Sequence, residues 1–183
     1  MSGRLILITG GSGSGKSAFA ERLLLREAAG RAVYLATMDG RDGESLHRIA
    51  RHRAMRSAHA QEAGRSFVTV EQPTGIGGAE IAPGDCVLLE DLGNLLANEL
   101  WSPEGAVAVA ESAVLAGIDG LLERAALLVV VSNEVFSDGY GYDEGTLGYI
   151  RALGRLHQAL ARRAVAVAEV VCGIPVWAKG GPL

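Results

Sequence analysis

Lysine and cysteine are both scarce in this chain of 183 residues, and long apolar runs are missing. The two cysteines, Cys86 and Cys172, match no metal-ligand spacing and no disulfide framework. We therefore expect both to be small buried hydrophobic residues. No stretch reaches the roughly 20 consecutive apolar residues that a membrane span requires, and the N-terminal apolar run is too short for a signal peptide. These absences predict a cytoplasmic protein without a membrane span.

The overall charge is also small. A formal net charge of −4 gives the molecule no general attraction for nucleic acid or for an acidic membrane, so we expect no nucleic-acid partner. The length suits one domain covering residues 1–183, and no repeat or linker divides the chain.

Five short apolar runs predict strands, separated by stretches with helical spacing. The runs are apolar at successive positions, which is typical of strands covered on both faces. Apolar residues three and four apart predict helices over Ser17–Ala29 and Gly145–Val165. Strands that alternate with helices indicate an α/β fold with a mostly parallel sheet and flanking helices. The predicted strands are Leu5–Thr9, Ala32–Thr37, Cys86–Glu90, Leu127–Ser132 and Val167–Cys172.

The first predicted strand leads into a glycine-rich turn with the pattern Gly10-x-x-x-x-Gly15-Lys16-Ser17, followed by a helix. Glycines let backbone amides turn toward phosphate oxygens, and the helix N-terminus adds positive potential. In this context the pattern predicts a P-loop of the RecA-like class that binds a nucleoside triphosphate. We expect Lys16 to reach the β- and γ-phosphates and the Ser17 hydroxyl to ligate Mg²⁺. The whole cradle is Gly10, Gly11, Ser12, Gly13, Ser14, Gly15, Lys16 and Ser17.

The scarcity of lysine supports this interpretation. Of the 17 basic residues, only Lys16 and Lys179 are lysines. A compact ammonium group at Lys16 suits a position among phosphates, where it acts as a point charge. The same scarcity leaves no Asn-Lys-x-Asp motif for reading guanine, which counts against a GTP-dependent switch protein.

A partner for the magnesium ion is expected at the end of a neighbouring strand. The run CVLLED ends in Glu90 and Asp91, and a carboxylate there could hold Mg²⁺ directly or through water. Glu90 is the favoured candidate because it extends the strand directly. The alternative is a pair of exposed acids at a strand end.

A second group of residues lies in the strongly basic segment Ser45–Gln61, which contains no acid. On a helix, Arg48, His52 and Arg56 would share one face, where like charges repel unless an anion lies against them. Nearby arginines disfavour protonation of His52, and neutral imidazole is a nucleophile as well as a proton carrier. The alternative is a solvated basic helix that carries an incidental histidine.

Several short motifs, taken together and in order, resemble the bifunctional adenosylcobinamide kinase/adenosylcobinamide-phosphate guanylyltransferase family of cobalamin biosynthesis. The resemblance covers Ile6–Pro175, and the pairing of the P-loop with Arg-Ile-x-x-His-Arg is its most specific part. The motifs are GGSGSGKS at 10–17, YLAT at 34–37, RIARHRAMR at 48–56, TVE at 69–71, LLED at 88–91, SNEV at 132–135 and GRLHQAL at 154–160.

The resemblance implies two reactions on a corrinoid substrate. A nucleoside triphosphate, GTP or ATP, phosphorylates the aminopropanol hydroxyl; GTP then guanylylates His52, and the corrinoid phosphate takes the GMP. His52 and Lys16 are thus the expected catalytic residues, with Ser17 and Glu90 at the metal. Relatives associate as trimers, so the resemblance also implies a homo-oligomer. The implied nucleotide contacts outside the P-loop are Ala36, Thr37, Met38, Arg53, Arg56, Glu71 and Glu90.

The sequence departs from the common family pattern at Gly13, Asp91 and Gly93 and again over residues 136–141. A P-loop small-molecule kinase without guanylyl transfer is therefore kept as an alternative. In such an enzyme Lys16, Ser17 and Glu90 would keep their roles, and His52 would have none.

Overall fold

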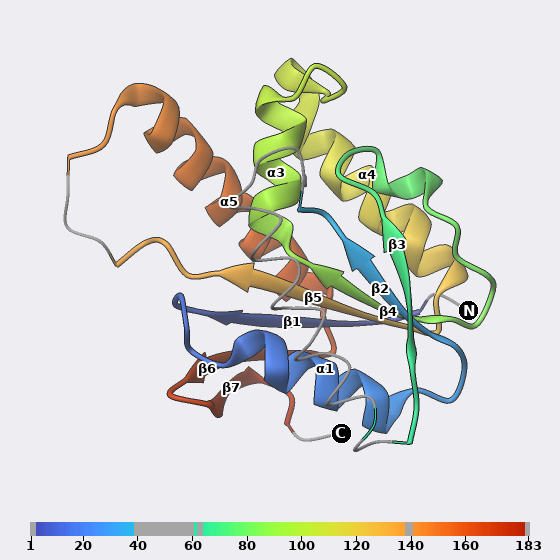
Figure 1. Ribbon diagram of the computed structural model, residues 1–183. Helices are drawn as coiled ribbons and strands as arrows, with labels where there is room; N and C mark the ends of the chain where they lie inside the picture. The colour runs from blue at the N-terminus through green and yellow to red at the C-terminus, as the bar shows by residue number, and fades with distance from the viewer. Residues whose placement is uncertain (1–2, 39–60, 62–63, 138–140, 182–183) are drawn as a thin grey trace.

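The structure, a computed structural model, describes residues 3–38, 61, 64–137 and 141–181. Within them a seven-stranded sheet has the strand order β3-β2-β4-β5-β1-β6-β7 (Figure 1). All neighbouring strands are parallel except β6 and β7, which form an antiparallel hairpin. The strands are β1 (Arg4–Gly10), β2 (Ala32–Ala36), β3 (Phe67–Glu71), β4 (Cys86–Glu90), β5 (Leu127–Asn133), β6 (Ala166–Val171) and β7 (Ile174–Lys179).

Helices cover both faces of this sheet (Figure 1). The helices are α1 (Lys16–Glu27), α3 (Leu92–Trp101), α4 (Ala110–Arg124) and α5 (Glu144–Arg163), with short 3-10 turns η1 (Ile76–Gly78) and η2 (Val107–Val109). Strand β1 shows why two layers are needed, because its successive side chains enter two separate cores. Leu5 and Leu7 pack with α3, α4 and α5, whereas Ile6 and Ile8 pack with α1. The predicted α/β fold with a mostly parallel sheet and flanking helices is confirmed.

Two helices begin at an aspartate that caps their first turn. The Asp91 carboxylate accepts a hydrogen bond from the amide of Asn94 at the start of α3. Asp143 does the same for Thr146 at the start of α5. Each cap satisfies an amide that has no partner within its helix. Asp91 thereby directs α3 away from the carboxyl end of β4.

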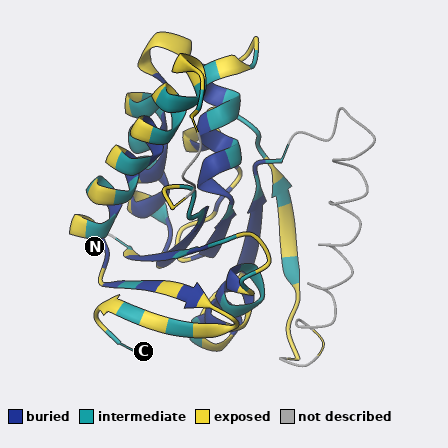
Figure 2. Ribbon diagram, turned by 90° about the vertical axis from the view of Figure 1, so that its left-hand side faces the viewer, coloured by how far each residue is buried: buried dark blue, intermediate teal, exposed yellow. Residues whose placement is uncertain are grey.

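The five predicted strands correspond to β1, β2, β4, β5 and β6, and the two predicted helices correspond to α1 and α5. The sequence reading missed the two edge strands, β3 and β7, and the helices α3 and α4. Figure 2 shows the reason for the edge strands: the central strands are buried, whereas β3 and β7 carry many exposed residues. An edge strand lacks the continuous apolar run by which the central strands were found.

One prediction about cysteine is wrong. Cys86 is buried in β4 as expected, but Cys172 is exposed. It lies after the last residue of β6, in the turn to β7, with a positive φ of 50°. The apolar residues before it belong to the strand, and the turn carries Cys172 out of the core.

None of the helices in the described part of the chain is long and apolar enough to cross a membrane. The prediction that residues 1–183 form one domain stays a prediction.

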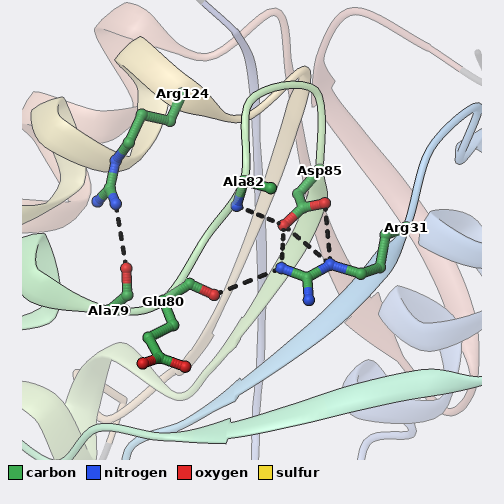
Figure 3. Close-up of polar contacts among 6 residues, drawn as sticks. All are labelled: Arg31, Ala79, Glu80, Ala82, Asp85 and Arg124. Atoms are coloured by element: carbon green, nitrogen blue, oxygen red, sulfur yellow. Dashed lines mark hydrogen bonds and ion pairs between the residues drawn. The ribbon is translucent and has the colours of Figure 1, made fainter.

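At the amino edge of the sheet, polar contacts join the starts of β2 and β4 (Figure 3). Asp85 is only 3% exposed and precedes β4. The guanidinium of Arg31, just before β2, donates to both carboxylate oxygens at 2.6–3.2 Å. The amide of Ala82 donates a further hydrogen bond at 2.8 Å. Burial works to raise the pKa of Asp85, but the hydrogen bonds and charge of Arg31, together with the Ala82 amide, lower it below its ordinary value of 3.8.

We predict that Asp85→Ala lowers the free energy of unfolding by about 2 kcal/mol, because it removes a buried charged acceptor from the Arg31 guanidinium and the Ala82 amide. Urea unfolding at pH 7 measures this change. Asp119→Ala is the control: it breaks the exposed pair with Arg163 and should cost less than about 1 kcal/mol.

Because the pKa of folded Asp85 lies below that of the unfolded chain, its stabilising effect is complete above the unfolded pKa and disappears as the pH falls. The difference between wild type and Asp85→Ala should therefore shrink in acid. Equal costs for the two variants at pH 7 would show that the Arg31–Asp85 contact does not stabilise the sheet.

Candidate active site

The predicted phosphate cradle lies at the carboxyl end of β1. Gly10 is the last residue of β1, and Lys16 is the first residue of α1. Between them the chain turns back on itself, with positive φ angles of 73° at Gly13 and 88° at Gly15. Residues with a side chain rarely adopt this backbone conformation, whereas glycine adopts it readily. The glycines therefore permit the turn. The strand, loop and helix follow one another as the P-loop prediction requires.

The hairpin of β6 and β7 supports the cradle from outside. The amide of Gly173, in the hairpin turn, donates to the carbonyl of Ser14 at 2.8 Å. A methyl group added at Gly10 would lie 2.7 Å from the carbonyl oxygen of Val170 and 2.6 Å from Ser14 Oγ. Gly10 is therefore fixed by close packing against β6. The cradle depends on this packing as well as on its own glycines.

Lys16 points into the loop that precedes it. Its residue exposure is 7%, and its Nζ donates to the carbonyl of Gly11 at 3.2 Å. This contact spans the loop, so the ammonium group lies over the turn that the motif predicts as the phosphate cradle. In this position the positive charge can meet phosphate oxygens.

Ser17 joins the cradle to the neighbouring strand β4. Its Oγ donates to Glu90 Oε1 at 2.7 Å, although the two residues are 73 positions apart in the sequence. Glu90 Oε2 is shielded from solvent and has no hydrogen-bond partner among the described residues. Ser14 Oγ, also in the cradle, is likewise buried and has no hydrogen-bond partner among the described residues. Such atoms are costly unless a ligand or water meets them.

The surroundings of Glu90 disfavour its negative charge. Burial is the main cause that raises the pKa of Glu90 to about 8, and the nearby charge of Asp91 adds to it. The hydrogen bond from Ser17 and the charge of Lys16 work in the opposite direction without cancelling the rise. A cation placed beside Glu90 would reverse this balance, because it favours the ionised carboxylate.

The geometry gives the two adjacent acids different positions. Asp91 Oδ1 accepts from the amide of Asn94, while Oδ2 lies 3.3 Å from Asn94 Nδ2 and 3.4 Å from Asn133 Nδ2. Asp91 is therefore engaged with helix α3 and the end of β5, whereas Glu90 faces Ser17. The sequence alone left the choice between them open.

Ser17 and Glu90 fit a magnesium ion by their chemistry. Both offer hard oxygen atoms, and magnesium in nucleotide sites typically takes one or two protein ligands together with phosphate and water. The unpaired Glu90 Oε2 supplies the acceptor such an ion would meet. No group of three or more histidine, cysteine or acidic side chains gathers as a metal site in residues 3–38, 61, 64–137 and 141–181.

The other expected nucleotide contacts within the described chain lie along the same sheet edge. Ala36, the last residue of β2, pairs in register with Glu90 of β4 and with Glu71 of β3. Thr37 is fully buried, and its hydroxyl donates to the carbonyl of Asp91 at 2.8 Å. Met38 follows directly and is half-buried. Parallel strands thus bring these positions to one edge, beside the cradle.

Sequence reasoning missed two polar residues that hold this edge together. Asn98 of α3 donates to the carbonyl of Thr37 at 2.7 Å and to that of Pro73 at 3.0 Å. His157 of α5 lies 2.7 Å from the Ser132 hydroxyl near the end of β5, and burial lowers the pKa of His157 to about 4. Neither contact can be predicted from the local sequence, because each one joins distant segments.

Three expected site residues lie outside the described residues: His52, Arg53 and Arg56. The predicted basic helix that carries them stays a prediction.

A comparison with protein-family models matches residues 6–177 to the family described as cobinamide kinase / cobinamide phosphate guanyltransferase. The chain belongs to this family. The match spans nearly the whole sequence and confirms the resemblance seen in the motifs. The protein is thus a nucleotide-using transferase of cobalamin biosynthesis, and neither a kinase without guanylyl transfer nor a switch protein is favoured.

Curated relatives agree with this family over their full length. The bifunctional adenosylcobalamin biosynthesis protein CobP of Pseudomonas aeruginosa is 36% identical over 181 residues, which cover 97% of this chain and 98% of the relative. The CobU proteins of Salmonella typhimurium and Escherichia coli are each 33% identical, and in both cases 96% of this chain and 99% of the relative are covered.

Similarity to solved structures is weaker. A KaiC-like protein of Pyrococcus horikoshii has a TM-score of 0.49 at 14% identity, with 92% of this chain and 71% of that chain covered. The flagellar accessory protein FlaH of Methanocaldococcus jannaschii has a TM-score of 0.44 at 11% identity, with 98% and 80% covered.

We predict that Gly10→Ala destabilises the protein even without nucleotide, because its methyl group would meet the Val170 carbonyl at 2.7 Å. Gly11→Ala is the matched control, since a methyl group at Gly11 meets no atom within 4 Å. Thermal unfolding of the nucleotide-free proteins should show a midpoint several degrees lower for Gly10→Ala and unchanged for Gly11→Ala. Equal midpoints would contradict the close packing of the cradle on β6.

Proposed function

We propose that the protein phosphorylates the aminopropanol hydroxyl of adenosylcobinamide and then transfers GMP from GTP to the resulting phosphate. The observation that carries the proposal is the contact between Ser17 of the P-loop and Glu90 at the end of β4. It places a hydroxyl and a carboxylate together beside the Lys16 ammonium group, in a chain that matches the family from residue 6 to residue 177.

In the kinase reaction, the substrate hydroxyl attacks the γ-phosphorus and releases its proton to solvent, and the bond from that phosphorus to the β–γ bridging oxygen breaks. The chain contributes position and charge: the cradle amides and Lys16 would hold the phosphates, and Ser17 with Glu90 would hold Mg²⁺. The ion, when bound, neutralises charge on the phosphate oxygens. Since phosphoryl transfer needs little covalent help from protein, these groups suffice for the reaction. ATP and GTP are both suitable donors for this step.

Guanylyl transfer needs a further group, because GMP passes through the protein in two steps. In the proposed mechanism a ring nitrogen of His52 bonds to the α-phosphorus of GTP, and pyrophosphate leaves. A phosphate oxygen of the corrinoid then attacks the same phosphorus, and the nitrogen–phosphorus bond breaks. Imidazole can act first as nucleophile and then as leaving group near neutral pH. Arg53 and Arg56 would stabilise charge on the phosphate during both steps.

The remaining nucleotide contacts are proposed at the same sheet edge. Strand β2 ends at Ala36 and is followed by Thr37 and Met38, and β3 ends at Glu71. These positions lie beside the carboxyl end of β4. Ligands of open α/β sheets bind at the carboxyl ends of the strands, which supports the proposal. We further propose that residues 1–183 form one cytoplasmic domain and that it assembles as a homo-oligomer, a trimer by resemblance to the family.

The two reactions can be separated by mutation. We expect His52→Ala to form no guanylylated protein when incubated with GTP labelled at the α-phosphate, because its nucleophile is gone. It should still phosphorylate adenosylcobinamide at a measurable rate. Lys16→Ala is the counterpart and should lose the kinase reaction, because it removes the side-chain cation of the cradle. The measurements are label retained on denatured protein and adenosylcobinamide phosphate formed.

In the wild type, the label should be released by acid and retained in alkali, as expected for a phosphoramidate and not for a serine ester. If His52→Ala carried as much GMP as the wild type, another residue would be the nucleophile. If the wild type formed neither product, the proposed function itself would be wrong.

A further inference from the structure

A large aromatic side chain lies exposed at the end of helix α3. Trp101 is 62% exposed, but its side-chain conformation is restricted because its ring stacks on Tyr149 of α5. The ring centroids are 5.6 Å apart and the planes meet at 30°. Stacking with this offset is a favourable aromatic geometry. The indole thus presents a flat apolar surface to solvent from a fixed position.

Tyr149 is itself anchored at the other end of α3. Its hydroxyl donates to the carbonyl of Gly93 at 3.2 Å. A methyl group added at Gly93 would lie 2.9 Å from that hydroxyl oxygen, so a side chain there would push Tyr149 away. Glycine at this position allows the close approach. Helices α3 and α5 therefore lie side by side (Figure 1).

Through the contact of Tyr149 with Gly93, the aromatic pair is anchored near the proposed catalytic edge. Gly93 is two residues from Asp91, which caps α3. It is three residues from Glu90, which accepts a hydrogen bond from Ser17 of the cradle. A methyl group added at Gly93 would also lie 3.2 Å from Asp91 Oδ1, so the phenol of Tyr149 is close to that carboxylate. Burial, with a contribution from the charge of Asp91, raises the pKa of Tyr149 to about 12. From Gly93 to Trp101 a helix rises about 12 Å, at about 1.5 Å per residue. A ligand that reaches from the cradle to Trp101 would follow this surface.

We propose that Trp101, held by Tyr149, is the stacking platform for the macrocycle of the corrinoid substrate; this inference rests on the function proposed above. The nucleotide is held by the cradle, so the second substrate must approach along the same edge with its hydroxyl toward Lys16. That substrate is a broad macrocycle with a flexible arm that ends in the hydroxyl. An exposed, rigidly held indole suits the ring, and the distance along α3 suits the arm.

The test compares substrate binding in Trp101→Ala with that in the wild type. The apparent KM for adenosylcobinamide in the kinase reaction, at saturating nucleotide, should rise at least about tenfold, equivalent to about 1.4 kcal/mol. The value of kcat should change little, because the cradle and Glu90 are intact. Trp101→Phe should recover part of the loss, since it keeps a stacking ring. Val176→Ala is the control: it removes a side chain from a residue that is 55% exposed, on edge strand β7.

Guanylylation of the protein by GTP needs no corrinoid, so it should be unchanged in Trp101→Ala and reports whether the rest of the site is sound. An unchanged KM in an active Trp101→Ala protein would overturn the inference. The inference would also be overturned if light scattering gave Trp101→Ala a different molecular mass from the wild type. That result would show that Trp101 lies between copies of the chain. A wild type inactive in both reactions would instead overturn the proposed function.

Discussion

The proposed site depends on one hydrogen bond, from the Ser17 hydroxyl to the Glu90 carboxylate at 2.7 Å. Glycine geometry shapes the loop before Ser17, and the parallel sheet brings the end of β4 close to the start of α1. Their meeting joins a cradle that carries the Lys16 cation to an acid whose second oxygen has no partner among the described residues. The buried, unpaired oxygen is unfavourable in the empty protein, and a bound cation would relieve that cost. The same residues thus limit stability and prepare the site for its ligand.

Much of this arrangement could be predicted from the sequence because local rules determine it. The glycine spacing before Lys16 specifies a phosphate loop, and unbroken apolar runs specify strands buried on both faces. Both signals act over fewer than about twenty residues, the range within which pattern reading is informative. The edge strands β3 and β7 were missed because they carry many exposed residues and lack a continuous apolar run.

What could not be predicted are contacts that the fold makes between distant segments. Which of Glu90 and Asp91 faces Ser17 depends on the path of the chain at the end of β4. Asn98 and Tyr149 reach the carbonyls of Thr37 and Gly93 from helices that sequence patterns do not place beside them. Membership of the family gives the chemistry of such a site, while these contacts show how this chain builds it.

The most direct test of the account is the magnesium requirement of GTP binding in Glu90→Gln. The amide oxygen of glutamine can still accept the Ser17 hydrogen bond, so the variant should fold, but it lacks the negative charge that the ion needs. In calorimetric titrations, the magnesium concentration for half-maximal GTP affinity should rise at least about tenfold, or about 1.4 kcal/mol. Asp91→Asn, which keeps a good helix cap, should leave that concentration unchanged. An unchanged requirement in Glu90→Gln, or a raised one only in Asp91→Asn, would contradict the assignment of Glu90 to the metal.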